Sequence, residues 1–277
     1  MTALLAIASS LLWGTSDFLG GTLSRRLAPV AVIGVSQALA IAVLLPVVLV
    51  TGELTADPAY LGWAVAAGLA GLVGLAAFYR ALAAGTMGVV APLAATGVVV
   101  PVAIGLAGGE SPHPVQLVGI AVTAAGIVLA CGPELHGAGR GGRRPLVLAA
   151  VAALGFGLAL VFIAKGSRSS AVMTLVAMRV TTVSVLGIAA LARRRGPGVV
   201  RADLPALAAV GIGDASANGA YAVASQTGLV SVVAVLASLY PVVTVVLARQ
   251  VHGERMRRVQ AVGVLGALTG VVLLAGG

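Results

Sequence analysis

Long apolar stretches, separated by short polar connections, dominate the pattern of hydrophobic and polar positions along this chain. Ten of them approach the ~20 residues that an α-helix needs to cross the hydrocarbon core of a membrane. They cover residues 4–23, 28–50, 60–83, 87–106, 115–131, 146–164, 172–192, 204–227, 229–249 and 259–275. Because they are continuous and lack period-2 alternation, they predict transmembrane helices and not the strands of a membrane barrel.

Composition supports the same class. Apolar residues make up 60% of the chain and charged residues 9%, whereas a soluble domain carries about 25% charged residues. The net charge of +9 would suggest nucleic acid in a soluble protein, but these arginines lie in short connections, where they favour cytoplasmic retention. We therefore predict a multi-pass protein of the cell membrane whose partners are the lipid bilayer and a small-molecule substrate, with no nucleic acid.

The two halves of the chain repeat each other. Five residues recur at an offset of 144, namely Gly109, Glu110, Gln116, Gly119 and Gly126 as Gly253, Glu254, Gln260, Gly263 and Gly270. The stretch 89–94 recurs at 232–237, at an offset of 143. Five predicted helices in each half place the second half upside down relative to the first, as in transporters with inverted repeats.

The predicted fold is an all-α integral membrane protein with ten transmembrane helices arranged as two inverted five-helix repeats. The first repeat covers residues 1–132, a basic linker 133–145 and the second repeat 146–277. Such a complete duplicated unit can work as a monomer or a homodimer. Twelve arginines lie in odd-numbered connections, against Lys165 and Arg168 in even-numbered ones. This asymmetry predicts that both termini lie outside the cytoplasm.

Several short motifs resemble the EamA-type branch of the drug/metabolite transporter superfamily. They are Trp13-Gly14, the run Tyr79-Arg80-Ala81-Leu82 followed by Gly85, and the paired Gly-Glu turns with Gln and Gly downstream. The resemblance covers both halves and implies a basket of ten helices that moves amino acids, sugars or related metabolites. It also implies a cavity lined by predicted helices 1, 3, 4, 6, 8 and 9.

Two features depart from that family pattern. Asp17 stands where such proteins often have a neutral residue. Members are also commonly drawn with both termini in the cytoplasm, which conflicts with the arginine distribution here.

Polar residues within the apolar stretches are the candidate functional groups. A charge at a helix centre costs roughly 2.5–3.5 kcal/mol on insertion scales, so such residues face a cavity or a partner. In the eighth predicted helix, Asp214, Asn218, Tyr221 and Ser225 share one face at helical spacing. This stripe predicts either a cavity wall that binds substrate or carries a proton, or a polar seam between helices.

The first and seventh predicted helices add further candidates. Trp13 and Asp17 share a helix face, where the indole could stack on substrate or simply pack between helices. Arg179 lies far from both ends of its apolar stretch and aligns with Gln37 at an offset of 142. Its guanidinium could bind a substrate carboxylate. Alternatively, Arg179 is an internal counter-ion to Asp214 or Asp17, and we favour an ion pair that opens and closes during transport.

Other conspicuous residues have structural explanations. Glu110 and Glu254 each precede an apolar stretch, so we expect each to stabilise the N-terminus of the helix that follows it. Pro92 and Pro101 interrupt predicted helix 4 and Pro241 interrupts predicted helix 9, where they can act as hinges or as static bends.

Enzyme signatures are missing from the sequence. It contains no HExxH, GxSxG, P-loop or Cys/His cluster, so we predict no catalytic residues, no metal and no cofactor. Energy would then come from a proton, ion or substrate gradient. The sequence predicts a secondary transporter of a small polar metabolite, and the carboxylates within the apolar stretches suggest coupling to protons. The alternatives are a multidrug exporter and an intramembrane enzyme that acts on lipid through Asp17 and Asp214.

Overall fold

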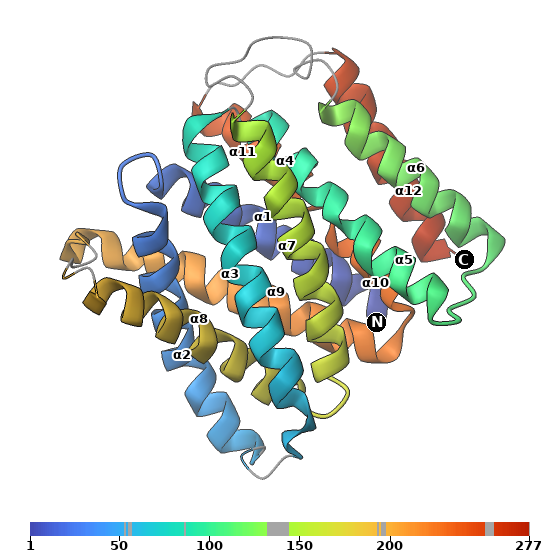
Figure 1. Ribbon diagram of the computed structural model, residues 1–277. Helices are drawn as coiled ribbons and strands as arrows, with labels where there is room; N and C mark the ends of the chain where they lie inside the picture. The colour runs from blue at the N-terminus through green and yellow to red at the C-terminus, as the bar shows by residue number, and fades with distance from the viewer. Residues whose placement is uncertain are drawn as a thin grey trace.

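The computed structural model describes the whole chain except residues 53, 55–56, 86, 132–143, 193, 195–197, 253–257 and 277, and the described part is helical, without strands (Figure 1). The α-helices are α1 (Thr2–Leu23), α2 (Pro29–Thr51), α3 (Leu61–Ala84), α4 (Met87–Ala95), α5 (Val99–Ala107), α6 (Pro114–Cys131), α7 (Arg144–Gly166), α8 (Ala171–Ala192), α9 (Leu204–Thr227), α10 (Val230–Ala237), α11 (Tyr240–His252) and α12 (Arg258–Gly276). Short 3-10 helices occur at Pro58–Tyr60 (η2), Thr96–Val98 (η3) and Arg201–Asp203 (η5).

These helices coincide with the apolar stretches of the sequence. Within the described residues, seven helical stretches are long and apolar enough to cross a membrane. The helix α9 is not among them, because polar residues such as Asp214 and Asn218 lower its hydropathy. The all-helical membrane class is confirmed, whereas the count of ten crossings and the inversion of the second half stay predictions.

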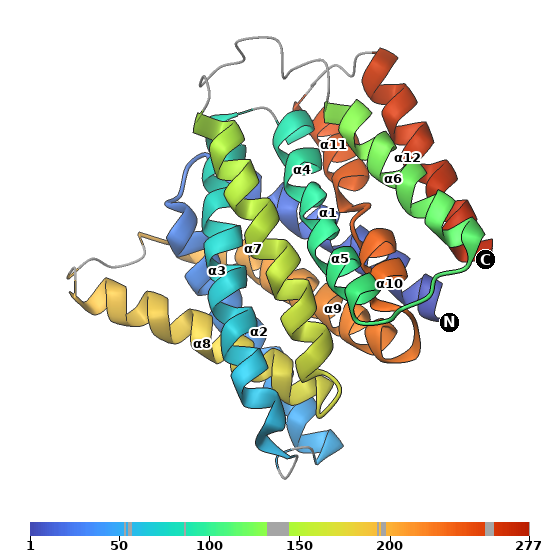
Figure 2. The ribbon, with the colours of Figure 1, turned by 45° about the vertical axis from the view of Figure 1, so that its right-hand side comes forward.

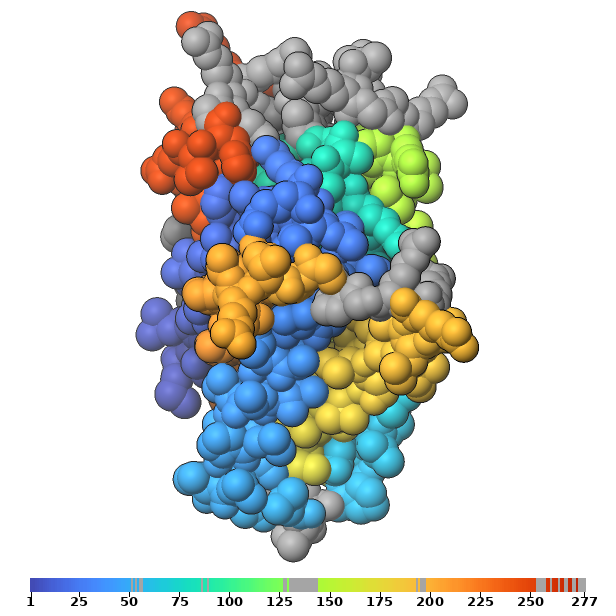
Figure 3. All heavy atoms as spheres, turned by 90° about the vertical axis from the view of Figure 1, so that its left-hand side faces the viewer, coloured from blue at the N-terminus to red at the C-terminus, as the bar shows by residue number. Residues whose placement is uncertain are grey.

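The helices of the two halves pack in matching pairs. The contact of α1 with α9 has its counterpart in the contact of α7 with α3, because exchange of the two halves converts one pair into the other. The pairs α6–α12 and α2–α8 each join equivalent helices. Figures 1 and 2 show α6 beside α12 at one end of the molecule, and Figure 3 shows α2 (light blue) against α8 (yellow) on one face.

Glycines allow the closest of these approaches, and they too come in equivalent pairs. A Cβ at Gly14 would collide with the carbonyl oxygen of Tyr240, and a Cβ at Gly157 would collide with that of Gly97. Both members of the second contact lie 143 residues from their counterparts in the first. The repeated sequence therefore forms repeated contacts between α1 and α11 and between α7 and η3.

Two of the apolar stretches contain a break at equivalent places. Between α4 and α5 the chain forms η3, and between α10 and α11 it forms a turn at Ser238 and Leu239. The prolines do not coincide with these breaks. Pro101 and Pro241 lie in the first turn of the helix after the break, where a missing N–H costs little, and α4 continues through Pro92. Whether any of the three acts as a hinge stays a prediction.

Candidate functional site

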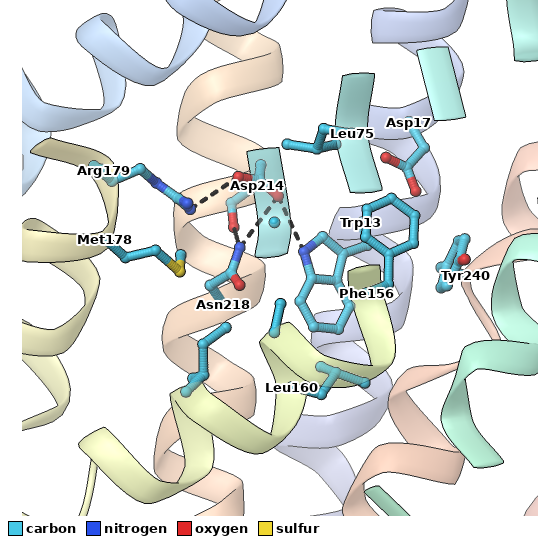
Figure 4. Close-up of a pocket in the computed structure, with 13 residues that line it drawn as sticks. Trp13, Asp17, Leu75, Phe156, Leu160, Met178, Arg179, Asp214, Asn218 and Tyr240 are labelled. Carbon is cyan, nitrogen blue, oxygen red and sulfur yellow. Dashed lines mark hydrogen bonds and ion pairs between the residues drawn. The ribbon is translucent and has the colours of Figure 1, made fainter. Parts of the chain in front are cut away.

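A cavity lies where helices of both halves meet (Figure 4). The space that the centres of water molecules could occupy is about 80 Å³, enough for several waters. Helices α1, α3, α7, α8, α9 and α11 supply its lining: Trp13, Asp17, Gly71, Leu75, Phe156, Ala159, Leu160, Ile163, Met178, Arg179, Asp214, Asn218 and Tyr240. The helix α8, which contributes Met178 and Arg179, corresponds to the seventh predicted helix. That helix was not among the lining helices that the family resemblance implied.

The carboxylate of Asp214 is the centre of a polar cluster in this cavity. The indole Nε1 of Trp13 donates to Oδ1 at 3.1 Å, and the amide of Asn218 donates to the same oxygen at 3.1 Å. The amide of Gln37 donates to Oδ2 at 3.0 Å, and Nη2 of Arg179 lies 2.8 Å from Oδ2. The structure thus brings five of the sequence candidates together around one buried carboxylate.

Arg179 and Asp214 form an ion pair deep in the bundle. Their exposed fractions are 3% and 8%, so both charges are removed from solvent. Neither Nε nor Nη2 of Arg179 makes an aligned hydrogen bond to the described residues, and both atoms are covered by protein. The negative charge of Asp214 is therefore the interaction that opposes the desolvation of Arg179.

Asp17 lines the same cavity but differs from Asp214 in its surroundings. It is 6% exposed, and no described residue donates a hydrogen bond to its carboxyl group or forms an ion pair with it. Figure 4 shows Asp17 near Trp13, while Arg179 lies on the far side of Asp214. The cavity therefore contains one carboxylate with four partners and one carboxyl group without a partner.

Equivalent positions of the two halves contribute unlike side chains to the cavity and its surroundings. At the repeat offset, five pairs that line or support it are Trp13/Phe156, Asp17/Leu160, Gly71/Asp214, Leu75/Asn218 and Gln37/Arg179. In four of these pairs only one member carries a charge, an amide or an indole N–H. The lining is therefore chemically asymmetric, although it draws on equivalent positions of the repeated sequence.

Two of the candidates lie behind the lining. Gln37 contacts Asp214 but is fully enclosed, and its Oε1 has no hydrogen-bond partner among the described residues. The hydroxyl of Tyr221 donates to the carbonyl of Leu160 at 3.2 Å, and its ring lies 5.9 Å from that of Trp13. Both side chains therefore position lining residues. Ser225, the last residue of the predicted stripe, donates to Ala222 in its own helix.

Of the three aromatic residues in the lining, sequence reasoning found Trp13 and missed the other two. Phe156 and Tyr240 contribute rings to the cavity, and both also line a smaller neighbouring cavity against η3. One signal was available, because Phe156 lies at the repeat offset from Trp13. Tyr240 had no such signal, since its equivalent is Gly97.

The expectation for Glu110 was wrong about which helix it stabilises. Its carboxylate accepts hydrogen bonds from the backbone N–H groups of Val230 at 2.9 Å and Ser231 at 3.0 Å. These groups belong to the first turn of α10, in the other half of the chain, and not to α6, which follows Glu110. The Gly-Glu turn is therefore a bridge between the halves. Its counterpart Glu254 lies outside the described residues.

One ion pair joins the connections at the ends of the helices. Arg26, after α1, contacts Asp203, before α9, at 2.5 Å. A backbone hydrogen bond from Val200 and the neighbouring Arg26 hold the pKa of the Asp203 carboxyl below its usual value. Many arginines used for the orientation argument, including Arg140, Arg143, Arg193, Arg195, Arg255 and Arg257, lie outside the described residues, so orientation stays a prediction.

Comparisons with known proteins agree with this architecture. The sequence profile of the EamA-like transporter family matches residues 1–132 and 143–276. No curated protein matches the chain. Among solved structures, 28 chains match, and one crystal structure, described only as that of a protein, has a TM-score of 0.76 at 19% identity, covering 98% of this chain and 95% of that chain. At that identity the likeness shows the fold alone.

Proposed function

The chain belongs to the EamA-like transporter family, and from this premise we propose that it is a secondary transporter that moves a small polar metabolite, such as an amino acid or a related compound, across the cell membrane by alternating access. Membership confirms the family resemblance of the sequence, and the family is one of transporters and not of enzymes. The observation that carries the proposal is the cavity between the two halves, which holds Asp17, Arg179 and Asp214 inside an apolar helical bundle.

The symmetry of the packing supports alternating access. The stretch 87–107 consists of α4 and then α5, and its equivalent 230–252 consists of α10 and then α11. The helix α10 packs against α5, and α11 packs against α4, so the first helix of each stretch contacts the second helix of the other. This is the arrangement expected for inverted repeats around an axis in the membrane plane. The α10–α5 and α11–α4 contacts are therefore equivalent to each other. If one opens while the other closes, the cavity is exposed to one side of the membrane at a time.

Proton coupling is the part of the proposal that concerns Asp17. The sequence has no nucleotide-binding motif, so a gradient must drive transport. A carboxyl group that lines the cavity without a partner can take up and release a proton during the cycle, whereas Asp214 accepts hydrogen bonds from three side chains and is paired with Arg179. That engagement also argues against the lipid-enzyme alternative, because a carboxylate dyad needs two groups that share a proton.

The test is transport by the purified protein in sealed vesicles. A thermal-shift screen against amino acids, sugars, nucleosides and amines would identify a ligand, and its labelled form would be offered to vesicles with and without an imposed pH gradient. We expect uptake that requires the protein and that changes with the gradient. Any uptake that remains in Asp17→Asn should no longer respond to the imposed pH gradient.

Each part of the proposal has its own contrary result. An uptake rate that ignores the pH gradient would remove proton coupling and leave transport intact. A ligand that binds but never crosses would remove transport. A lipid product formed by the wild-type protein and lost in Asp214→Asn would favour the enzyme alternative.

A further inference from the structure

We propose that the cavity selects a small organic monocation, with the ammonium group of the ligand against Asp17 and its apolar body between the rings of Trp13, Phe156 and Tyr240. The inference rests on the proposed function and narrows its substrate class from small polar metabolites in general to amines without an acid group, so amino acids would not be the preferred substrates. Binding itself can be measured without transport, so the two can fail separately.

The charge of the lining gives the first argument. Two acidic side chains, Asp17 and Asp214, and one basic side chain, Arg179, line the cavity. The last two neutralise each other at 2.8 Å, and Trp13 and Asn218 complete the contacts of Asp214 from the cavity side. The charge that remains for a ligand is the one on Asp17. The described residues supply neither a cation nor several donors for this buried group, so without a ligand it takes up a proton. A ligand cation that displaces this proton would form the missing ion pair.

The walls give the second argument. Trp13 precedes Asp17 by one helical turn, so the indole and the carboxyl group lie on the same face of α1. Phe156 and Tyr240 add rings from α7 and α11. Aromatic faces attract cations, most strongly where water is excluded. The remaining lining, which includes Leu75 and Ile163, is apolar and suits a hydrocarbon body.

The environment of Arg179 argues against an anionic ligand. Its Nε and Nη2 atoms are covered by protein, so a ligand carboxylate could not bind the guanidinium through two nitrogens unless the contact with Asp214 opened. That carboxylate would also lie near Asp17 and Asp214, and like charges repel strongly in such a site. A zwitterion suffers the same repulsion at one end. The lining therefore favours an amine without an acid group.

The test compares four ligands of equal carbon number: butylammonium, butan-1-ol, butanoate and 4-aminobutanoate. They differ chiefly in being cationic, neutral, anionic and zwitterionic. The chain has two tryptophans, and Trp63 lies outside the cavity, where it stacks on Phe162. In a Trp63→Phe background the fluorescence of Trp13 therefore reports on the site. We expect butylammonium to bind about tenfold or more tightly than the other three.

Variants assign this preference to the carboxylate. Asp17→Asn should weaken butylammonium binding by about tenfold or more while leaving butan-1-ol within about twofold. Asp17→Glu keeps the charge and should keep the preference, which guards against a variant that merely fails to fold. Phe156→Leu should weaken the cation by about threefold. Asp203→Asn removes a carboxylate outside the cavity and should leave the binding of all four ligands unchanged.

Several results would overturn the inference. They are equal or tighter binding of 4-aminobutanoate or butanoate, a cation preference that survives Asp17→Asn in a folded protein, and no binding by any of the four ligands. If butylammonium binds through Asp17 but no amine crosses vesicles, the inference stands and the transport proposal fails. If vesicles transport only neutral or acidic metabolites, transport stands and the inference fails.

Discussion

Gln37 and Arg179 occupy equivalent positions in the two halves of the chain, and both reach the same atom, Oδ2 of Asp214. The amide donates to it at 3.0 Å and the guanidinium lies 2.8 Å away. The carboxylate of Asp214 therefore lies between two equivalent positions of the repeated sequence. Asp214 connects α2, α8 and α9 through one oxygen, and its other oxygen receives Trp13 from α1.

Breaking the Arg179–Asp214 pair at one end should destabilise the protein more than removing both charges. Arg179→Met leaves Asp214 buried without a counter-ion, which typically costs about 3–5 kcal/mol. Arg179→Met with Asp214→Asn removes both charges, and the double variant should recover a large part of that loss. Thermal unfolding of the detergent-solubilised variants measures the difference. Equal losses in the single and double variants would show that the pair contributes little.

Much of the helical framework could be predicted from the sequence, because apolar length is a strong local signal. The apolar stretch 204–227 and helix α9 share the same bounds, although Asp214 and Asn218 interrupt its apolar character. The η3 break was not predicted. Thr96 and Gly97 lie inside a continuous apolar run, and the break is fixed by the approach of Gly157 from another helix, which no local pattern reports.

The candidate site was predictable to the extent that buried charge is costly. Arg179 and Asp214 stood out because few ionisable residues lie inside the apolar stretches, and their pairing followed from similar depth. Glu110 was assigned to the wrong helix because its acceptor geometry depends on how the halves dock, with Val230 lying 120 residues away. Contacts between the halves were thus the part that sequence spacing could not supply.

Glu110 should stabilise the docking of α10 through its two backbone hydrogen bonds. Glu110→Ala removes both acceptors from the first turn of α10, and we expect a loss of about 1.5–3 kcal/mol, since the acceptor is charged. Asp57→Ala is a matched control, because Asp57 also accepts a hydrogen bond near a helix start, from Ala59, but is exposed. Equal thermal shifts for the two variants would contradict a special role for Glu110.

The close approaches at Gly14 and Gly157 should not tolerate a methyl group. Gly14→Ala and Gly157→Ala place a Cβ against the carbonyl oxygens of Tyr240 and Gly97, and overpacking of this kind costs about 1–3 kcal/mol. Gly187→Ala in α8 is the control, because nothing lies within 4 Å of its Cβ position. Its stability should stay the same or rise, since alanine favours a helix over glycine. Similar losses in all three variants would mean that the helix contacts do not depend on these glycines.

The contact between Arg26 and Asp203 should make stability depend on pH in the acid range. The folded protein holds the pKa of Asp203 below its usual value, because the Val200 backbone N–H and Arg26 favour the carboxylate. Its contribution is therefore fully present above the unfolded pKa of about 3.9 and is lost as pH falls through the lower folded pKa. The unfolding temperature of the wild type should fall as pH falls through that window, and Asp203→Asn should remove this part of the pH dependence. Arg26→Gln tests the cause of this pH dependence. It should leave part of the dependence, because the hydrogen bond from Val200 to Asp203 remains. An acid profile that is unchanged in Asp203→Asn would show that other groups control the pH dependence of stability.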